Sequence, residues 1–75
     1  MIKLKVLDTL SVDEGRTLVA LQGTSSIDSY TYLLTEDGIK YKIIGRATQS
    51  IYAYDHKIID LLVKGSFDYK EAYLC

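Results

Sequence analysis

Apolar and polar residues alternate most clearly in residues 30–44, with the sequence YTYLLTEDGIKYKII. Two arms rich in aromatic and β-branched residues flank Thr-Glu-Asp-Gly at 35–38, and Asp-Gly supplies the left-handed backbone that a tight hairpin turn needs. In the second arm Ile39, Tyr41 and Ile43 alternate with two lysines, so one face can meet a core while the other meets water. The pattern predicts two antiparallel strands and identifies the inside and outside of a sheet.

The N-terminal residues 2–7 show the same period of two, with Leu4 and Val6 predicted to face inward and the lysines outward. Polar and apolar residues alternate at 8–12, and we expect this segment to bend over the core. A charged turn at 13–16 then leads into a short, mostly apolar strand at 17–21, TLVAL. These two strands should form a second hairpin.

The segments outside these two hairpins are harder to assign. Residues 23–29, GTSSIDS, predict a surface loop that carries Ile27 as an anchor into the core. Residues 51–54, IYAY, predict a short strand. Residues 57–64 fit an amphipathic helix, with Asp55 as its N-cap and Gly65 just past its end, but they also fit a half-buried strand. Their short length and the strands before them favour the strand.

The C-terminal residues 67–74 predict a helical turn, capped by Ser66, in which Tyr69 and Tyr73 stand four apart on one side. We expect the aromatic residues of this turn to pack over one end of the fold. Short strands joined mostly by tight turns predict an all-β protein, either a small six-stranded barrel or a sandwich, made of one domain over residues 1–75.

Composition agrees with one small globular domain, since 48% of the 75 residues are hydrophobic and 25% are charged. No apolar run approaches the roughly 18 residues of a membrane span, and the N-terminus does not resemble a signal peptide. The single cysteine, Cys75, allows neither an intramolecular disulfide nor a zinc cluster. We therefore expect a cytoplasmic protein that does not bind a membrane.

The net charge of −1 gives no overall field that would attract nucleic acid, so any RNA contact has to be local. Seven tyrosines are the side chains best suited to recognition, because aromatic faces stack on bases and bury well at interfaces. If the lysines at 3, 5, 40 and 42 come from neighbouring strands, they form one basic outer face near Arg46. The alternative is a solvated sheet face that resists edge pairing. The candidate binding residues are Lys40, Lys42, Arg46, Tyr52 and Tyr54.

Catalytic chemistry has little support in the sequence. The only histidine, His56, follows Asp55, and neighbours in an extended strand point to opposite faces, so they do not form an oriented catalytic pair. The carboxylate pairs at 13–14 and 36–37 lie in predicted turns, where water should keep their pKa values near normal. No phosphate-binding loop, dinucleotide fingerprint or calcium loop occurs. The sequence predicts a protein that is not an enzyme and takes no nucleotide, metal or other cofactor.

Three segments resemble the β-barrel second domain of translation GTPases of the elongation factor Tu and initiation factor 2 type. Residues 7–19, LDTLSVDEGRTLV, are similar to the family signal "D-x-F-x-x-x-G-R-G-T-V" with one glycine missing. Residues 58–65, IIDLLVKG, are similar to the closing strand "N-V-G-L-L-L-R-G", with Asp60 in place of a glycine. Residues 41–45, YKIIG, resemble the strand before the family's variable loop, whereas residues 26–32 lack the glycines of its "G-x-(I/V)-x-x-G-D" turn.

The resemblance implies a closed six-stranded Greek-key barrel with a short C-terminal helical turn, and it favours a strand at 57–64. It also implies a stand-alone binding module without turnover that contacts a protein or a structured RNA. The alternatives are a small protein-interaction or inhibitor domain unrelated to translation, and a hydrolase built on His56.

Overall fold

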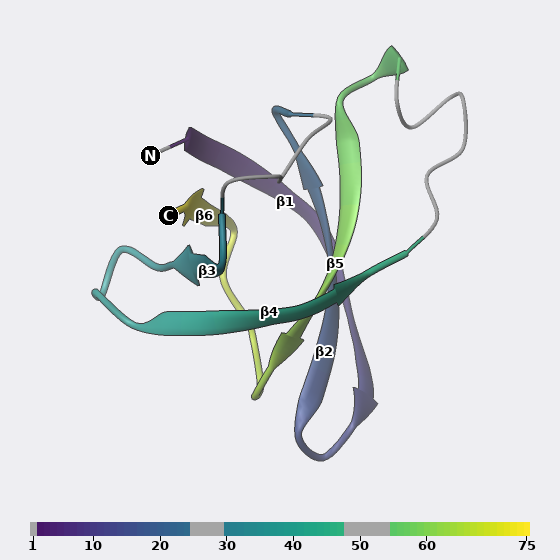
Figure 1. Ribbon diagram of the computed structural model, residues 1–75, viewed down its shortest axis with the longest axis vertical. Helices are drawn as coiled ribbons and strands as arrows, with labels where there is room; N and C mark the ends of the chain where they lie inside the picture. The colour runs from purple at the N-terminus through teal and green to yellow at the C-terminus, as the bar shows by residue number, and fades with distance from the viewer. Residues whose placement is uncertain (1, 25–29, 48–54) are drawn as a thin grey trace.

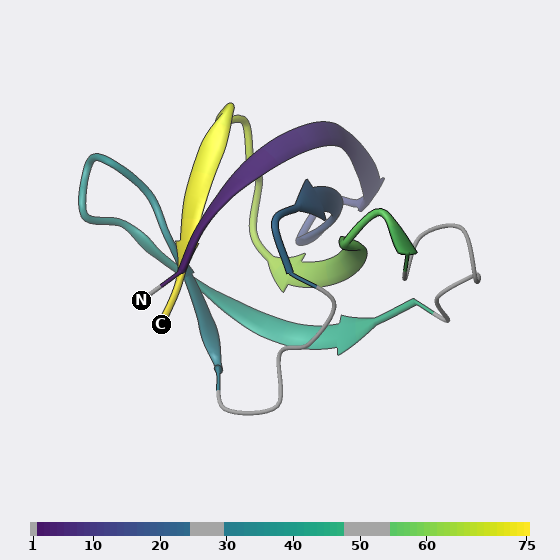
Figure 2. The same cartoon turned by 90° about the horizontal axis from the view of Figure 1, so that it is seen from above.

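The computed structural model describes residues 2–24, 30–47 and 55–75, and every regular element in these ranges is a strand. The strands are β1 (Ile2–Asp13), β2 (Arg16–Gln22), β3 (Tyr32–Leu34), β4 (Lys40–Arg46), β5 (Ile58–Lys64) and β6 (Glu71–Leu74). All neighbours are antiparallel, and the order β1-β2-β5-β4-β3-β6 closes into a barrel (Figure 1). Figure 2 shows the strands wrapped around a common interior.

The strand order contains a Greek key, because β3, β4 and β5 lie side by side and β6 returns to lie beside β3. The prediction of an all-β, closed, six-stranded Greek-key barrel is therefore confirmed. In the described part of the chain, no helix has the length and apolarity needed to cross a membrane.

The barrel interior is filled by alternate residues of the strands, as the period of two requires. The buried apolar side chains are Leu4, Val19, Leu21, Leu33, Ile59, Leu61, Val63, Phe67, Ala72 and Leu74. Val6, Tyr41 and Ile43 are half-buried and pack against this core, as predicted. Ile39 is 45% exposed, so its predicted inward position is wrong; it lies in the turn, one residue before β4 begins.

The turn between β3 and β4 follows the Asp-Gly prediction. Gly38 has a φ of 82°, in the left-handed region, and its N–H donates to the carbonyl oxygen of Thr35 at 3.0 Å. The buried hydroxyl of Thr35 accepts a hydrogen bond from the N–H of Ile39 at 3.2 Å. The turn thus satisfies its own polar groups, which fixes the register of the hairpin.

Strand β1 is longer than the strand predicted at residues 2–7. It continues to Asp13 through two irregularities, between Val6 and Asp8 and between Ser11 and Asp13. Such bulges increase the twist and bend of a strand, which is how residues 8–12 curve while staying paired with β2. Only residues 2–5 of β1 also pair with β6.

The predicted helical turn at 67–74 is wrong: residues 66–70 are irregular and Glu71–Leu74 form β6, which closes the barrel. The hydroxyl of Thr17 holds this segment extended, donating to the carbonyl of Gly65 at 2.7 Å and accepting from the N–H of Phe67 at 3.3 Å. The alternation of buried Ala72 and Leu74 outweighs the spacing of the tyrosines. Tyr69 packs instead against Phe67 and Tyr41, with ring centroids 5.3 and 6.2 Å away.

Of the ambiguous residues 57–64, Ile58–Lys64 form strand β5, as favoured by their length and neighbours, and Lys57 lies in the turn before it with a φ of 55°. Gly65 has a φ of 102° and ends this strand rather than a helix. Ile27, the strand predicted at 51–54 and the candidate binding residues Tyr52 and Tyr54 lie outside the described residues.

Candidate functional site

An apolar row crosses the outside of the barrel over four neighbouring strands. Leu10 of β1 pairs with Leu18 of β2, Leu18 pairs with Leu62 of β5, and Leu62 pairs with Gly45 of β4. Leu10 is 62% exposed, and Leu18 and Leu62 are half-buried. Ile44, in the bulge beside Gly45, is 43% exposed. The apolar row is defined as Leu10, Leu18, Leu62, Ile44 and Gly45.

The two sides of the apolar row carry opposite charges. On one side Ala20 pairs with Asp8 of β1 and with Asp60 of β5. On the other side Arg16 of β2 pairs with Lys64 of β5. A sheet surface with an apolar centre and charged borders of opposite sign has the composition of a protein interface. The docking face is defined as the apolar row together with Asp8, Arg16, Ala20, Asp60 and Lys64.

A hollow of about 190 Å³ lies on the acidic side of the docking face. It is lined by Asp8, Thr9, Leu10, Leu18, Ala20 and Asp60. Aliphatic walls beside two carboxylates suit a side chain with an apolar stem and a cationic end, such as lysine. The hollow therefore fits a basic side chain presented by a partner.

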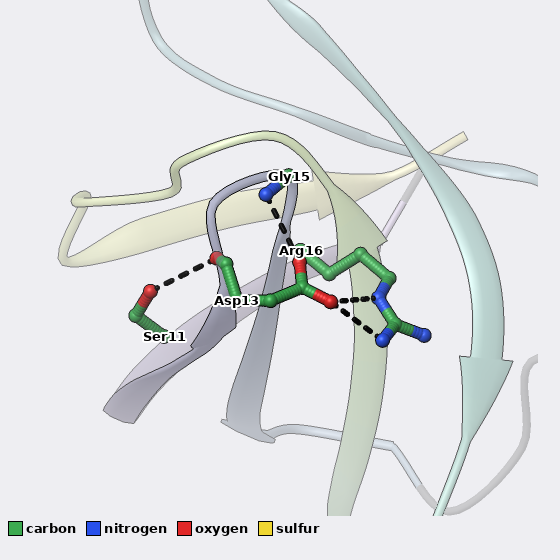
Figure 3. A network of polar contacts seen from close by, with 4 residues as sticks. All are labelled: Ser11, Asp13, Gly15 and Arg16. Carbon is green, nitrogen blue, oxygen red and sulfur yellow. Dashed lines mark hydrogen bonds and ion pairs between the residues drawn. The ribbon is translucent and has the colours of Figure 1, made fainter.

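The turn between β1 and β2 contains an ion pair at the basic side of the docking face (Figure 3). The Nε and Nη2 atoms of Arg16 donate to one carboxylate oxygen of Asp13 at 2.8 and 2.6 Å, and the N–H of Gly15 donates to the other at 3.0 Å. The hydrogen bonds from Arg16 and then from Gly15 lower the pKa of Asp13. Asp13 balances the charge of Arg16, whereas no described carboxylate forms an ion pair with Lys64. Lys64 is therefore the unbalanced cation on β5.

The candidate binding residues Lys40 and Lys42 are exposed on β4, and Lys42 is two residues before Ile44 of the apolar row. They lie opposite Leu34 and Tyr32 of β3, and the Nζ atom of Lys40 is 5.6 Å from the centroid of the Tyr32 ring. The bulge between Ile43 and Gly45 interrupts the alternation of β4, so Arg46 lies opposite buried Leu61. Arg46 is exposed but does not continue the face that the two lysines form.

The single basic face that the sequence suggested requires β1 and β4 to be neighbours, and they are not. Strands β3 and β6 separate them on one side of the barrel, and β2 and β5 on the other. The side chain of Lys3 on β1 instead forms an ion pair with that of Glu71 on β6, with 3.0 Å between Nζ and Oε2. This hydrogen bond raises the pKa of Lys3 and lowers that of Glu71.

The residues considered for catalysis are all exposed. His56 is exposed in the turn before β5, as predicted, and its carbonyl oxygen accepts a hydrogen bond from Gln22 at 3.2 Å. Across residues 2–24, 30–47 and 55–75, no three His, Cys, Asp or Glu side chains gather to hold a metal ion. The carboxylate pairs do not both keep ordinary pKa values, because Arg16 lowers the pKa of Asp13 and a hydrogen bond with Glu71 raises that of Glu36.

Comparison of the chain with protein-family models, with curated proteins and with solved structures finds no match. What is shown is therefore the architecture, a small closed six-stranded antiparallel β-barrel.

The docking face was not among the sites predicted from the sequence, although a signal for it exists. The segments TLVAL at 17–21 and IIDLLV at 58–63 are apolar at successive positions, so both faces of these strands are apolar. A strand with one face in water alternates polar and apolar residues, as KYKI at 40–43 does. Near-continuous apolar strands are typical of sheets that are buried on both faces.

Proposed function

We propose that this protein is a non-enzymatic binding module whose docking face engages another protein. The observation that supports this most is the apolar row, continuous over β1, β2, β5 and β4. Single exposed apolar side chains are ordinary on a protein surface, whereas a contiguous apolar patch with a polar border marks an interaction site.

The chemistry of the docking face favours a protein over a nucleic acid. Nucleic-acid sites neutralise phosphates with lysine and arginine, and Asp8 and Asp60 beside the hollow would repel phosphates. A protein surface that presents apolar side chains and a lysine or arginine complements both the apolar row and the hollow. The expected partner is therefore a folded protein with an apolar, partly basic patch.

The proposal includes the absence of catalytic activity. Catalytic groups with shifted pKa values usually lie together in a cleft. The described carboxyl groups with shifted pKa values belong to surface pairs, Asp13 with Arg16 and Glu71 with Lys3 and Glu36. Burial raises the pKa of Tyr41, which packs in the aromatic cluster with Phe67 and Tyr69. The proposal takes these groups as structural, including Glu36 and Glu71, which line a second hollow of about 350 Å³ together with Tyr69.

A stand-alone cytoplasmic barrel of the translation-GTPase second-domain type is the finer form of the proposal. Its support is the order of sequence signals together with the closed six-stranded Greek key. Because one fold serves many functions, the proposal takes no tRNA or ribosome contact from that family. A protein-interaction or inhibitor domain unrelated to translation would use the same docking face.

A second candidate function is contact with structured RNA through β3 and β4. The observation that favours it is the exposed cluster of Lys40, Lys42 and Tyr32, in which a cation lies over an aromatic ring. Binding through a few phosphates should weaken steeply between about 50 and 200 mM salt, and Lys42→Gln should reduce the slope by about one unit. Salt-independent binding, or none, would remove this candidate.

The test of the docking face uses a matched pair of variants at exposed apolar residues. Leu10→Glu places a charge in the apolar row, whereas Ile39→Glu places the same charge in the turn between β3 and β4, which projects from another part of the barrel (Figure 1). Immobilised wild-type chain and both variants are used to capture protein from a native lysate, with and without nuclease.

We expect nuclease-resistant protein capture that Leu10→Glu abolishes and Ile39→Glu preserves. Capture that nuclease removes, or that survives Leu10→Glu unchanged, would contradict binding of a protein at the docking face.

A further inference from the structure

We infer that the docking face associates with the docking face of a second copy of this chain, about a twofold axis that runs along the apolar row. This inference rests on the proposed function and names its partner. It follows from the order of charges on the two sides of the apolar row, which makes the surface complementary to itself.

The argument starts from the register of β5. Asp60, Leu62 and Lys64 are alternate residues that point outward, and they place a carboxylate, an apolar side chain and an ammonium in one line along the strand. A twofold axis through Leu62, parallel to the apolar row, turns this line end for end. Leu62 then lies over Leu62 of the second copy, and Asp60 lies over Lys64 of the second copy. Symmetry produces this ion pair twice.

The same axis extends the match to the neighbouring strands. Leu18 and Leu10 each lie nearest to their own counterparts, so the central part of the apolar row, on β2 and β5, is covered in both copies. A twofold axis along the strands would instead place Asp60 over Asp60 and Lys64 over Lys64. Like charges in contact oppose association, so the charge pattern selects the first arrangement.

The hollow supplies a place for the side chain that the second copy presents. Lys64 of the second copy approaches Asp60, which lines the hollow together with Asp8. The walls formed by Leu18 and Ala20 suit the aliphatic stem of the lysine, and the carboxylates suit its ammonium.

The size and charge of the protein agree with weak, reversible association. The docking face crosses four of the six strands of a closed barrel, so only its central part can contact a second barrel, which gives an interface at the small end of specific interfaces. A standard interface takes about 800 Å² from each partner, about a sixth of this chain's 4838 Å² surface. A net charge of −1 creates almost no repulsion between copies. We expect a dissociation constant of about 10 to 1000 µM.

The experiment is sedimentation velocity over about 10 µM to 2 mM protein in reducing buffer, which keeps Cys75 from cross-linking chains. Four samples are compared: wild type, Asp60→Lys, Lys64→Asp and an equimolar mixture of these two variants. Circular dichroism confirms that each variant is folded. Lys40→Asp, a charge reversal outside the docking face, serves as the control.

Wild type and Lys40→Asp should associate as concentration rises. Each docking-face variant alone should associate at least about tenfold more weakly, because both of its symmetric contacts become repulsive. The mixture should recover wild-type association. In a mixed dimer, the lysine at position 60 of one variant faces the aspartate at position 64 of the other. In the second contact, Lys64 of the first variant faces Asp60 of the other, as in the wild type.

A wild-type chain that remains a monomer over the whole range overturns the inference, as does a mixture no stronger than the single variants. Neither result removes the proposed function, which the capture by wild type and Leu10→Glu decides separately. A monomer whose protein capture depends on Leu10 retains the docking face with a different partner.

Discussion

Two outer surfaces of the same barrel are built in different ways. Where β4 pairs with β3, the outward residues Lys40 and Lys42 are exposed and face Leu34 and Tyr32. Where β2 pairs with β5, the outward residues Leu18 and Leu62 are apolar, although the interior is already filled by Val19, Leu61 and other buried side chains. The first surface is dominated by the two lysines, with Tyr32 37% exposed beside them. The second contains apolar area that the barrel core does not use, which is why we assign it to a partner.

The contrast also exists within one strand, between Leu61 and Leu62. Leu61 is fully buried in the core, whereas Leu62 is half-buried on the outside. Leu61→Ala should lower the free energy of unfolding by about 2 to 5 kcal/mol, because it removes buried methyl groups and leaves a cavity. This is a large part of the roughly 4 to 11 kcal/mol expected for 75 residues.

Leu62→Ala should cost about 1 kcal/mol or less in the monomer. Urea denaturation at low protein concentration measures both values. Equal losses for the two leucines would show that Leu62 belongs to the core and that the apolar row is not an outer surface.

Two glycines provide the next contrast. Gly23 has a φ of 140°, and a Cβ added there would come within 2.6 Å of a Leu4 side-chain carbon. Gly23→Ala should therefore lower the free energy of unfolding by about 1 to 3 kcal/mol. Gly45 lies in the apolar row, where an added Cβ meets Leu62 at an ordinary 3.8 Å.

Gly45→Ala should change the free energy of unfolding by less than about 0.5 kcal/mol, since the methyl group lies on the surface. Thermal or urea unfolding of both variants checks the pair. A strongly destabilised Gly45→Ala variant would mean that this part of the apolar row is tightly packed rather than open.

The charged surface of β3 and β4 should be insensitive to substitution. Lys40→Gln removes the cation above the Tyr32 ring and should lower the free energy of unfolding by at most about 0.5 to 1 kcal/mol. Self-association should stay at the wild-type level. If Lys40→Gln instead abolished association, the interface would lie on the charged surface and the assignment of the two surfaces would be reversed.

The smallest expected effect is the pH dependence supplied by Asp13 at the turn beside the docking face. Hydrogen bonds from Arg16 and Gly15 lower its pKa in the folded state below the ordinary value of 3.8. Such a carboxyl stabilises the folded state above its unfolded pKa, and this contribution is lost as pH falls through the folded pKa. The effect should be small, because the pair is exposed to water.

The measurement compares wild type with Asp13→Asn by urea denaturation near pH 7 and near pH 2. The stability advantage of wild type should be present at the higher pH and should shrink at the lower. An advantage that grows with acidity would contradict the direction of the pKa shift.

Much of the fold was predictable from local pattern. The Asp-Gly turn at 37–38 and the hairpin of β1 and β2 are determined by residues close in sequence, whereas the strand at 58–64 was favoured by its length and by the strands before it. The C-terminal strand was mistaken for a helical turn because its extension depends on Thr17, far away in sequence, whose hydroxyl contacts the main chain at Gly65 and Phe67. A contact between residues so far apart in the chain leaves no periodic pattern in the sequence.

The candidate site was less predictable, for reasons of topology and register. The sequence placed Lys3 and Lys40 on one face, but the strand order separates β1 from β4. The bulge after Ile43 takes Arg46 out of the alternation, and bulges have no reliable sequence mark. The apolar row depends on Leu10, Leu18 and Leu62 meeting across strands, which only the register shows.

The most direct test of the central claim, that copies of the chain associate through the docking face, is a concentration series of amide spectra of the isotopically labelled chain. The account predicts progressive chemical-shift changes at Leu10, Leu18, Asp60, Leu62 and Lys64, with Lys40 unchanged. Changes centred on Lys40 and Lys42, or unchanged spectra up to about 2 mM, would contradict it.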